Sequence, residues 1–219
     1  MKNKILVVAV HPDDETLGCG GTLLKHKANG DQIHWLICTT LKKDNNYYHI
    51  REKEIKKVSK LFDFNSYHHL EFETSKIDQY SMVELIEKIS RVINKIKPNT
   101  IYLPFRNDVH SDHKKIFEAS YSCTKSFRYS FIKKIYMMET LSETEFSLNN
   151  KKDIFVPNTF VNISKYINKK IRIMKVYKSE ISKFPFPRSE KNIRALANFR
   201  GATCGYKHAE SFMLLKEIF

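Results

Sequence analysis

The sequence predicts one α/β domain over residues 1–219, built on a mostly parallel β-sheet that is flanked by helices on both faces. Three observations predict it. Short apolar runs of strand length alternate with longer stretches of helical period. The chain opens in the order strand, helix, strand, which is typical of a parallel pair. A length of 219 residues suffices for one large core, and no Pro/Gly/Ser-rich linker divides it.

The first half of the chain supplies the opening unit. The apolar run at 5–10 has strand length, the stretch 16–29 fits a helix closed by Gly30, and 32–39 is strand-like again. The elements predicted next are a charged amphipathic helix at 49–62, a short strand at 67–72, a helix at 81–96 with Pro98 beyond its end, and a buried strand at 100–103.

The second half continues the alternation. Its predicted elements are a helix at 110–123, a strand at 134–138, a polar loop at 141–152 around Asn149 and Asn150, a strand at 159–163, a helix from 164 to about 181, a break at FPFP, a helix from about 188, and a strand at 211–215. This order predicts a Rossmann-like architecture.

Positive charge is concentrated in one segment. The formal net charge is +14, and residues 164–194 contain seven Lys and three Arg against Glu180 and Glu190, a net of +8. Such a run fits a solvated helix face, a contact for an anionic substrate or membrane surface, or nucleic-acid binding. No nucleic-acid-binding motif accompanies it, so we expect no nucleic-acid partner.

Cysteine usage and hydropathy favour a cytoplasmic protein without a transmembrane segment. The four cysteines are scattered and show no C-x-x-C pair. The N-terminal apolar stretch is short, lacks a cleavage site and does not resemble a signal peptide, and no run reaches membrane-spanning length. The sequence leaves the oligomeric state open, including a homo-oligomer.

An acid cluster lies directly after the first predicted strand. Ligands of open α/β sheets bind beyond the carboxyl ends of strands, where His11, Pro12, Asp13, Asp14 and Glu15 are expected. Capping of the following helix explains one of these acids. It does not explain His11 three residues before Asp14, a spacing that lets an imidazole and a carboxylate reach one cation. Zinc accepts both ligand types, and a catalytic site needs a third.

A second polar cluster follows the predicted strand at 100–103. It reads FRNDVHSDHKK, and it should open onto the same edge of the sheet as His11. His110 and His113 flank Asp112. One histidine can ligate a metal while the other faces the reacting group, and the carboxylate can orient an imidazole.

Two other enzyme classes with acids or glycines after a strand do not fit. A haloacid-dehalogenase-type phosphatase needs D-x-D-x-T, but Pro12 stands where its first aspartate would be. A dinucleotide-binding fold needs G-x-G-x-x-G between strand and helix, whereas GCGG follows the acids, which would repel a pyrophosphate. A non-catalytic module that binds a metal, an anion or nucleic acid remains the alternative.

The motifs together resemble the LmbE/PIG-L family of zinc-dependent N-deacetylases. The resemblance rests on AVHPDDETLGCGGTL, on REKE at 51–54, on HSDH, and on the ending FRGATCGYKHAESF. Ser111 departs from the family, which often has proline there. Members act on N-acetylated amino sugars in glycolipids, thiol precursors, antibiotics or cell-surface glycans, so the resemblance implies removal of an acetyl group from a GlcNAc-type substrate. That sugar is either free or linked to a nucleotide or lipid.

The resemblance also implies roles for individual residues. His11, Asp14 and His113 would hold one Zn²⁺ per chain, with Fe²⁺ or Co²⁺ as alternatives. Asp13 would be the general base, and His110 would stabilise the oxyanion or donate a proton.

Two further residues are expected to support the site. Asp112 would orient a histidine from outside the metal. Arg51 would contact the substrate, although an ion pair with Glu54 one helical turn away is an equally good interpretation. We also expect kcat/KM for the substrate to fall as salt rises, because the cations of 164–194 would speed the capture of a sugar that carries an anionic group. Reversing several of these charges should flatten this dependence, and a neutral sugar would show none.

Overall fold

The computed structural model describes residues 2–148 and 154–219. In these residues seven strands form one sheet in the order β3-β2-β1-β4-β5-β7-β6. The strands are β1 (Lys4–Ala9), β2 (Gln32–Thr40), β3 (Ser66–Glu73), β4 (Thr100–Leu103), β5 (Lys134–Met138), β6 (Thr159–Asn162) and β7 (Ala209–Glu217). Strands β1 to β5 pair in parallel, and β7 runs antiparallel to β5 and β6. The predicted mostly parallel sheet is confirmed.

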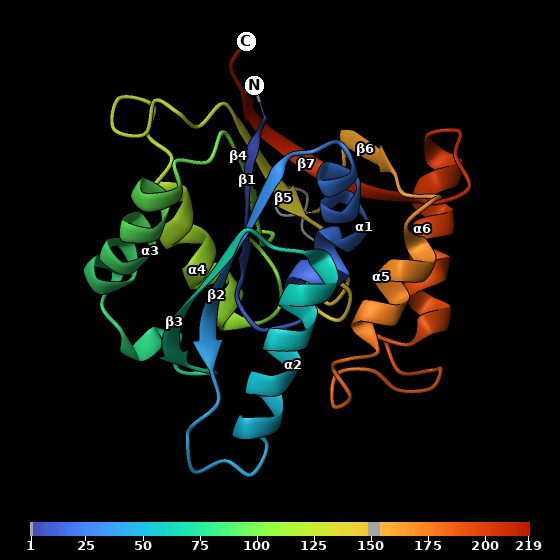
Figure 1. The fold of residues 1–219 in the computed structure, drawn as a ribbon, viewed down its shortest axis with the longest axis horizontal. Coiled ribbons are helices and arrows are strands. Elements are labelled where there is room, and N and C mark those ends of the chain that lie inside the picture. The colour runs from blue at the N-terminus through green and yellow to red at the C-terminus, as the bar shows by residue number, and fades with distance from the viewer. Residues whose placement is uncertain (1, 149–153) are drawn as a thin grey trace.

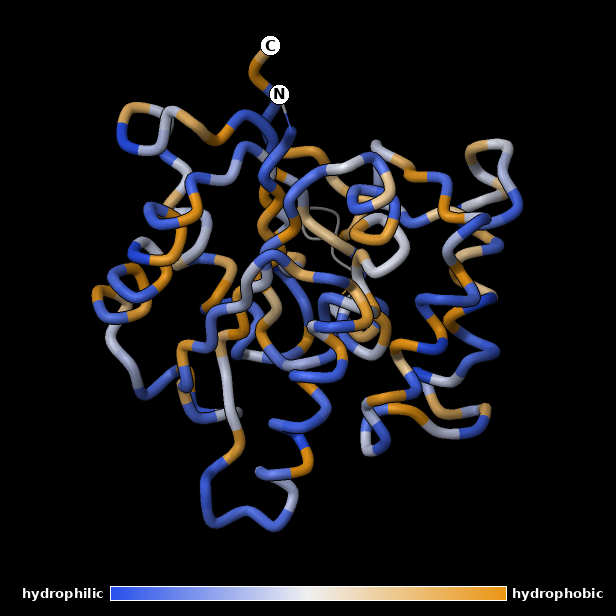
Figure 2. Tube along the Cα trace, viewed as in Figure 1, coloured by the Kyte–Doolittle hydropathy of each residue, from blue (hydrophilic) through white to orange (hydrophobic). Residues whose placement is uncertain are grey.

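Helices cover both faces of the sheet, as the sequence predicts (Figure 1). One face is covered by α1 (Asp14–Ala28), α2 (Tyr48–Phe62), α5 (Ile167–Met174) and α6 (Glu190–Thr203), and the other by α3 (Met82–Ile96) and α4 (Ser111–Ser122). Because side chains alternate along a strand, Ile5 and Val7 of β1 pack into the first core and Leu6 and Val8 into the second. Figure 2 shows hydrophobic residues gathered along the central strands and a hydrophilic loop between β2 and α2.

Helix α1 is broken in its middle, and the break is stabilised by a buried ion pair. Cys19 has non-helical dihedral angles (φ −144°, ψ 21°). The Glu210 carboxylate of β7 accepts hydrogen bonds from the backbone N–H groups of Gly21 (2.8 Å) and Thr22 (2.7 Å), and Lys170 of α5 donates to it at 2.7 Å. These contacts hold α1 against β7 and α5, and so fix the position of its first turn at the end of β1.

The glycines around this break allow close packing. A Cβ atom at Gly18 would lie 2.6 Å from the Met138 sulfur, and one at Gly21 would lie 2.7 Å from Ile163. Both distances are too short for a side chain. The sequence GCGG therefore lets α1 approach the sheet, and it is not a phosphate-binding loop.

The prediction of one long helix from 164 to about 181 is wrong at its C-terminal end. Helix α5 stops at Met174, because Tyr177 turns inward, is fully buried, and donates a hydrogen bond to Glu15 (2.9 Å). The backbone N–H of Lys178 then donates to Glu54 of α2 (3.1 Å). The chain after α5 is thereby drawn toward the start of α1 and α2.

The remaining predicted elements are present with boundaries that differ by a few residues. Helix α1 begins at Asp14 and β7 extends over nine residues. The predicted loop around Asn149 and Asn150 lies partly outside the described residues. Among the helices that the structure describes, none is long and apolar enough to cross a membrane.

Candidate active site

The two polar clusters meet at one edge of the sheet. Strands β1 and β4 are parallel neighbours, so their carboxyl ends place the loop 10–13 beside the loop 104–110. A cavity of about 210 Å³ opens there and is lined by His11, Asp13, Asp14 and His110, among others. The fold therefore brings the two clusters together at one edge of the sheet, as the sequence predicts.

Three side-chain atoms that can ligate a metal converge next to this cavity. His113 Nε2 lies 3.3 Å from His11 Nδ1 and 3.4 Å from Asp14 Oδ2, and His11 Nδ1 lies 3.9 Å from the same carboxylate oxygen. Ligands held at 2.0–2.2 Å in a tetrahedron lie about 3.3–3.6 Å apart. Two of the three separations lie in this range and the third is slightly longer, so the three side chains are close enough to hold one metal ion.

Two carboxylates set the tautomers of these histidines. His113 Nδ1 donates to Asp108 (2.8 Å), and His11 Nε2 donates to Asp112 (3.3 Å). The opposite nitrogen of each ring, which carries the lone pair, then faces the convergence point. Carboxylates commonly orient metal-binding histidines in this way.

The electrostatics of the cluster favour a cation. Burial lowers the pKa of His113, but the carboxylates of Asp14 and Asp108 outweigh it and raise that pKa to about 10. A field that stabilises a proton on this imidazole also stabilises a metal ion beside it. The residues present therefore fit a divalent cation with two imidazole ligands and one carboxylate.

A second grouping, formed by His11, His110 and Asp112, shares one residue with the first. Its carboxylate is already engaged, because Asp112 accepts from the backbone N–H groups of Ser75 (2.7 Å) and Ile77 (3.3 Å). Burial raises the pKa of Asp112, but the His11 and Ser75 hydrogen bonds bring it below its usual value. The Asp112 carboxylate therefore orients the His11 ring and also accepts hydrogen bonds from two backbone N–H groups.

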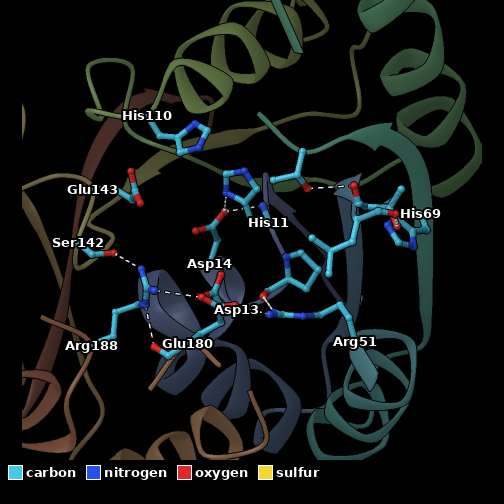
Figure 3. Close-up of a pocket in the computed structure, with 14 residues that line it drawn as sticks. His11, Asp13, Asp14, Arg51, His69, His110, Ser142, Glu143, Glu180 and Arg188 are labelled. Carbon is cyan, nitrogen blue, oxygen red and sulfur yellow. Dashed lines mark hydrogen bonds and ion pairs between the residues drawn. The ribbon is translucent and has the colours of Figure 1, made fainter. Parts of the chain in front are cut away.

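Asp13 lies next to Asp14 but points to a different part of the cavity (Figure 3). Its φ of 141° is unusual for a residue with a side chain, and its backbone N–H donates to Glu15 (3.1 Å). Burial raises the pKa of this carboxyl group, and the negative charge of Asp14 adds to the effect. Strained backbone and a raised pKa are both typical of catalytic carboxylates.

His110 is the N-cap residue of α4, and its ring caps the helix. Nδ1 accepts a hydrogen bond from the backbone N–H of Asp112 at 3.1 Å, so a neutral ring carries its proton on Nε2. Burial lowers the pKa of His110, and proximity to His11 lowers it further. The hydrogen bond between His110 and Asp112 thus involves the backbone of Asp112, and the Asp112 carboxylate orients His11.

Arg51 lines the cavity, and its guanidinium is already bonded to protein groups. Nη1 donates to the Pro12 carbonyl at 2.8 Å, Nη2 contacts the Glu180 carboxylate, and Nε lies 3.3 Å from Glu54. The ion pair with Glu54, expected as the alternative, is present. Through Pro12 the side chain also fixes the loop that carries Asp13.

The sequence did not single out several residues that line the cavity. They are Thr40, Leu41, His69, Thr74, Ser142, Glu143, Glu180 and Arg188. Most come from loops without a motif, so no local pattern could have identified them. Asp108 is different, because it lies five residues before His113 in the same cluster and was a detectable carboxylate partner.

Several charges of the 164–194 segment are paired with acids. Lys170 pairs with Glu210 (2.7 Å), Lys175 and Arg194 pair with Glu190, and Arg188 pairs with Glu180. Arg188 is also a lining residue of the cavity. The net charge of the segment therefore overstates the number of cations that are available to a ligand.

Comparison with known proteins points to a family of deacetylases. Residues 6–124, more than half of the chain, match the family described as PIG-L: GlcNAc-PI de-N-acetylase. A diacetylchitobiose deacetylase of Thermococcus kodakarensis is 24% identical over 99% of this chain and 84% of its own length. The structure of the N,N'-diacetylchitobiose deacetylase of Pyrococcus horikoshii covers 98% of this chain and 84% of that chain, with a TM-score of 0.79 and 20% identity.

The same fold also occurs in an enzyme of another class. The 4-carboxy-2-hydroxymuconate hydratase of Pseudomonas putida covers 100% of this chain and 98% of its own, with a TM-score of 0.78 and 13% identity. Likeness at this level of identity shows the fold alone. The activity must therefore be argued from the site.

Proposed function

Since this chain belongs to the PIG-L family, we propose that it hydrolyses the acetamide of an N-acetylated amino sugar and releases acetate and the free amine. The observation that carries the proposal is the convergence of His11 Nδ1, His113 Nε2 and Asp14 Oδ2 next to the buried Asp13. Two neutral imidazoles and one carboxylate form the donor set of many hydrolytic zinc sites.

His11, Asp14 and His113 would hold one Zn²⁺ per chain, with Fe²⁺ or Co²⁺ as alternatives. Such an ion supplies an acidified water and polarises the acetyl carbonyl. Asp108 and Asp112 hold the two imidazoles in the tautomers that coordination needs.

Asp13 acts as the general base in this proposal. Its carboxylate takes a proton from the attacking water while the water oxygen bonds to the acetyl carbon. The carbon–nitrogen bond then breaks, and the same proton passes to the departing nitrogen. A carboxyl group with a raised pKa suits both transfers.

His110 stabilises the negative charge that develops on the acetyl oxygen. Its Nδ1 is occupied by the helix cap, so Nε2–H is the donor available to the substrate. Arg51 holds the Pro12 carbonyl and lines the cavity, where its guanidinium edge would contact a sugar hydroxyl.

The substrate is a small N-acetyl amino sugar of the GlcNAc type, and nucleic acid has no part in the reaction. A cytoplasmic location is also proposed, on the cysteine pattern of the sequence.

The test is incubation of zinc-loaded protein with N-acetylglucosamine and N,N'-diacetylchitobiose, with mass spectrometry to detect loss of acetyl groups. His113→Ala should lose both metal and activity. A hydratase would leave the acetamide intact, and a non-catalytic module would bind metal without releasing acetate. Either result would contradict the proposal.

A further inference from the structure

Ser142 and Glu143, which follow β5, form one wall of the cavity, and an arginine holds this short segment. Ser142 has a left-handed backbone (φ 72°), and its Oγ accepts a hydrogen bond from Arg188 Nη1 at 2.7 Å. The other guanidinium nitrogens of Arg188 donate to the carbonyl (2.8 Å) and the carboxylate (3.0 Å) of Glu180. Arg188 thus ties the loop after β5 to the loop before α6.

Glu143 follows Ser142 in this wall. Its backbone N–H donates to Thr140 (3.2 Å), and its carbonyl accepts from Val109 (3.1 Å). Figure 3 shows the side chain on the side of the cavity where His110 and Asp14 lie. In the described part of the chain, its Oε2 is buried without a hydrogen-bond partner. The backbone is therefore fixed, and the carboxylate faces a cavity that a ligand would fill.

The cations in the cavity wall are already neutralised. Figure 3 shows Arg51 and Arg188 on opposite sides of Asp13. Arg51 is paired with Glu54 and Glu180, and Arg188 is paired with Glu180. No lysine is among the described residues that line the cavity. A phosphate or carboxylate on the substrate would therefore meet Glu143 and find no unpaired arginine or lysine in this wall.

We propose that Glu143 is a specificity-determining residue that selects neutral N-acetylated glycans and disfavours sugars with an acidic group next to the acetamide-bearing ring. Glu143 accepts hydrogen bonds from sugar hydroxyls, and Arg188 is a positioning residue that holds the loop carrying it. This inference rests on the proposed deacetylation. It excludes nucleotide-linked and phospholipid-linked sugars as the preferred substrates, because their phosphate would lie close to a like charge.

A matched pair of substrates tests this directly. Zinc-loaded protein is assayed with the methyl β-glycoside of N-acetylglucosamine and with N-acetylglucosamine 1-phosphate at pH 8, since burial raises the pKa of Glu143 to about 7. We expect kcat/KM to favour the neutral sugar by roughly tenfold, as for one like-charge contact in a partly solvated site. Glu143→Gln should remove most of this preference, mainly by lowering KM for the phosphate.

Glu118→Gln is the matched control. Glu118 is an exposed residue of α4 whose carboxylate lies 3.4 Å from Lys115, and the same charge is removed there. It should keep the wild-type preference. A preference for the phosphate, or an unchanged ratio in Glu143→Gln, would overturn the inference.

Binding separates this inference from the proposed reaction. The two sugars are titrated calorimetrically into zinc-loaded Asp13→Asn, with and without Glu143→Gln. If neither sugar is hydrolysed by the wild type, the proposed function is wrong. A neutral-over-phosphate binding ratio that disappears with Glu143→Gln would still support the assigned selectivity, and a ratio that does not change would overturn it.

Discussion

Asp13 and Asp14 are adjacent in the sequence but have separate surroundings. The Asp14 oxygen lies 3.4 Å from His113 Nε2 and accepts the His11 backbone N–H at 2.8 Å, which places it with the residues proposed to bind metal. Asp13 is buried between Arg51 and Arg188 and makes no ligand contact of this kind. This difference predicts different consequences for the same substitution at the two positions.

Asp13→Asn should retain metal and lose hydrolysis by roughly 10²- to 10⁴-fold, because proton transfer is removed while coordination is kept. Asp14→Asn should weaken the binding of metal itself, since an amide is a poorer ligand than a carboxylate. Chelator competition measures metal affinity, and acetate release measures turnover. Equal loss of metal in both variants would show that the two roles are misassigned.

At the level of elements, the broken helix α1 depends on a buried pair from two distant elements. Lys170 and Glu210 are each about 5% exposed. Glu210→Ala would leave the Lys170 ammonium buried without a counter-charge and two backbone N–H groups unpaired. We expect the free energy of unfolding to fall by about 3 to 5 kcal/mol, measured by urea denaturation.

The double variant Lys170→Met with Glu210→Gln serves as the control for this prediction. It removes both charges and keeps one hydrogen-bond acceptor, so it should lose clearly less stability than Glu210→Ala. An equal loss in both would mean that packing at the break, and not the buried charge, stabilises α1.

Strand β2 contains a histidine that makes stability depend on pH. His34 is nearly buried, its Nδ1 pairs with Ser66 Oγ at 2.8 Å, and in the described part of the chain its Nε2 has no hydrogen-bond partner. Burial lowers the pKa of His34 from 6.5 to about 4. Between these two values the unfolded chain takes up a proton that the folded chain excludes, so stability falls as the pH drops.

Above pH 6.5 the His34 ring is neutral in both the folded and the unfolded chain, so it does not destabilise the fold. As the pH falls toward 4, protonation of His34 in the unfolded chain decreases the free energy of unfolding by at most about 3 kcal/mol. Denaturation of the wild type and of His34→Gln at pH 7 and pH 5 checks it. The stability difference between the two proteins should shift in favour of the variant at pH 5, and parallel curves would show that His34 is not the titrating group.

At the level of the whole molecule, the net charge of +14 does not by itself make the substrate anionic. Arg188, the cation of the 164–194 segment that reaches the cavity, is paired with Glu180. The proposed neutral substrate replaces the expectation from the sequence that kcat/KM falls with salt. We now expect kcat/KM to change little as salt shortens the Debye length from about 10 Å at 0.1 M to about 3 Å at 1 M. A steep decrease with salt would indicate an anionic substrate attracted by this segment.

The sequence predicted the fold, and it predicted that His11, Asp14 and His113 lie close together. Both predictions rest on local patterns. Strand periodicity and the positions of the loops after β1 and β4 are local properties, and parallel pairing brings those loops together. The cavity wall was not predictable, because Glu143, Glu180 and Arg188 reach it through long-range packing. The early end of α5 has the same origin, since the buried contact of Tyr177 with Glu15 overrides local helix propensity.

The most direct test of the account is acetate release from a neutral N-acetylglucosaminide, measured on one preparation in three states. These are the protein as purified, the protein after treatment with a chelator, and the chelated protein after one equivalent of Zn²⁺ is added. Activity should be present, absent and restored in turn, and Asp13→Asn should stay inactive although it binds the returned ion. Full activity in the metal-free protein, or no acetate release from the zinc-loaded wild type, would contradict the assignment of this site to metal-dependent deacetylation.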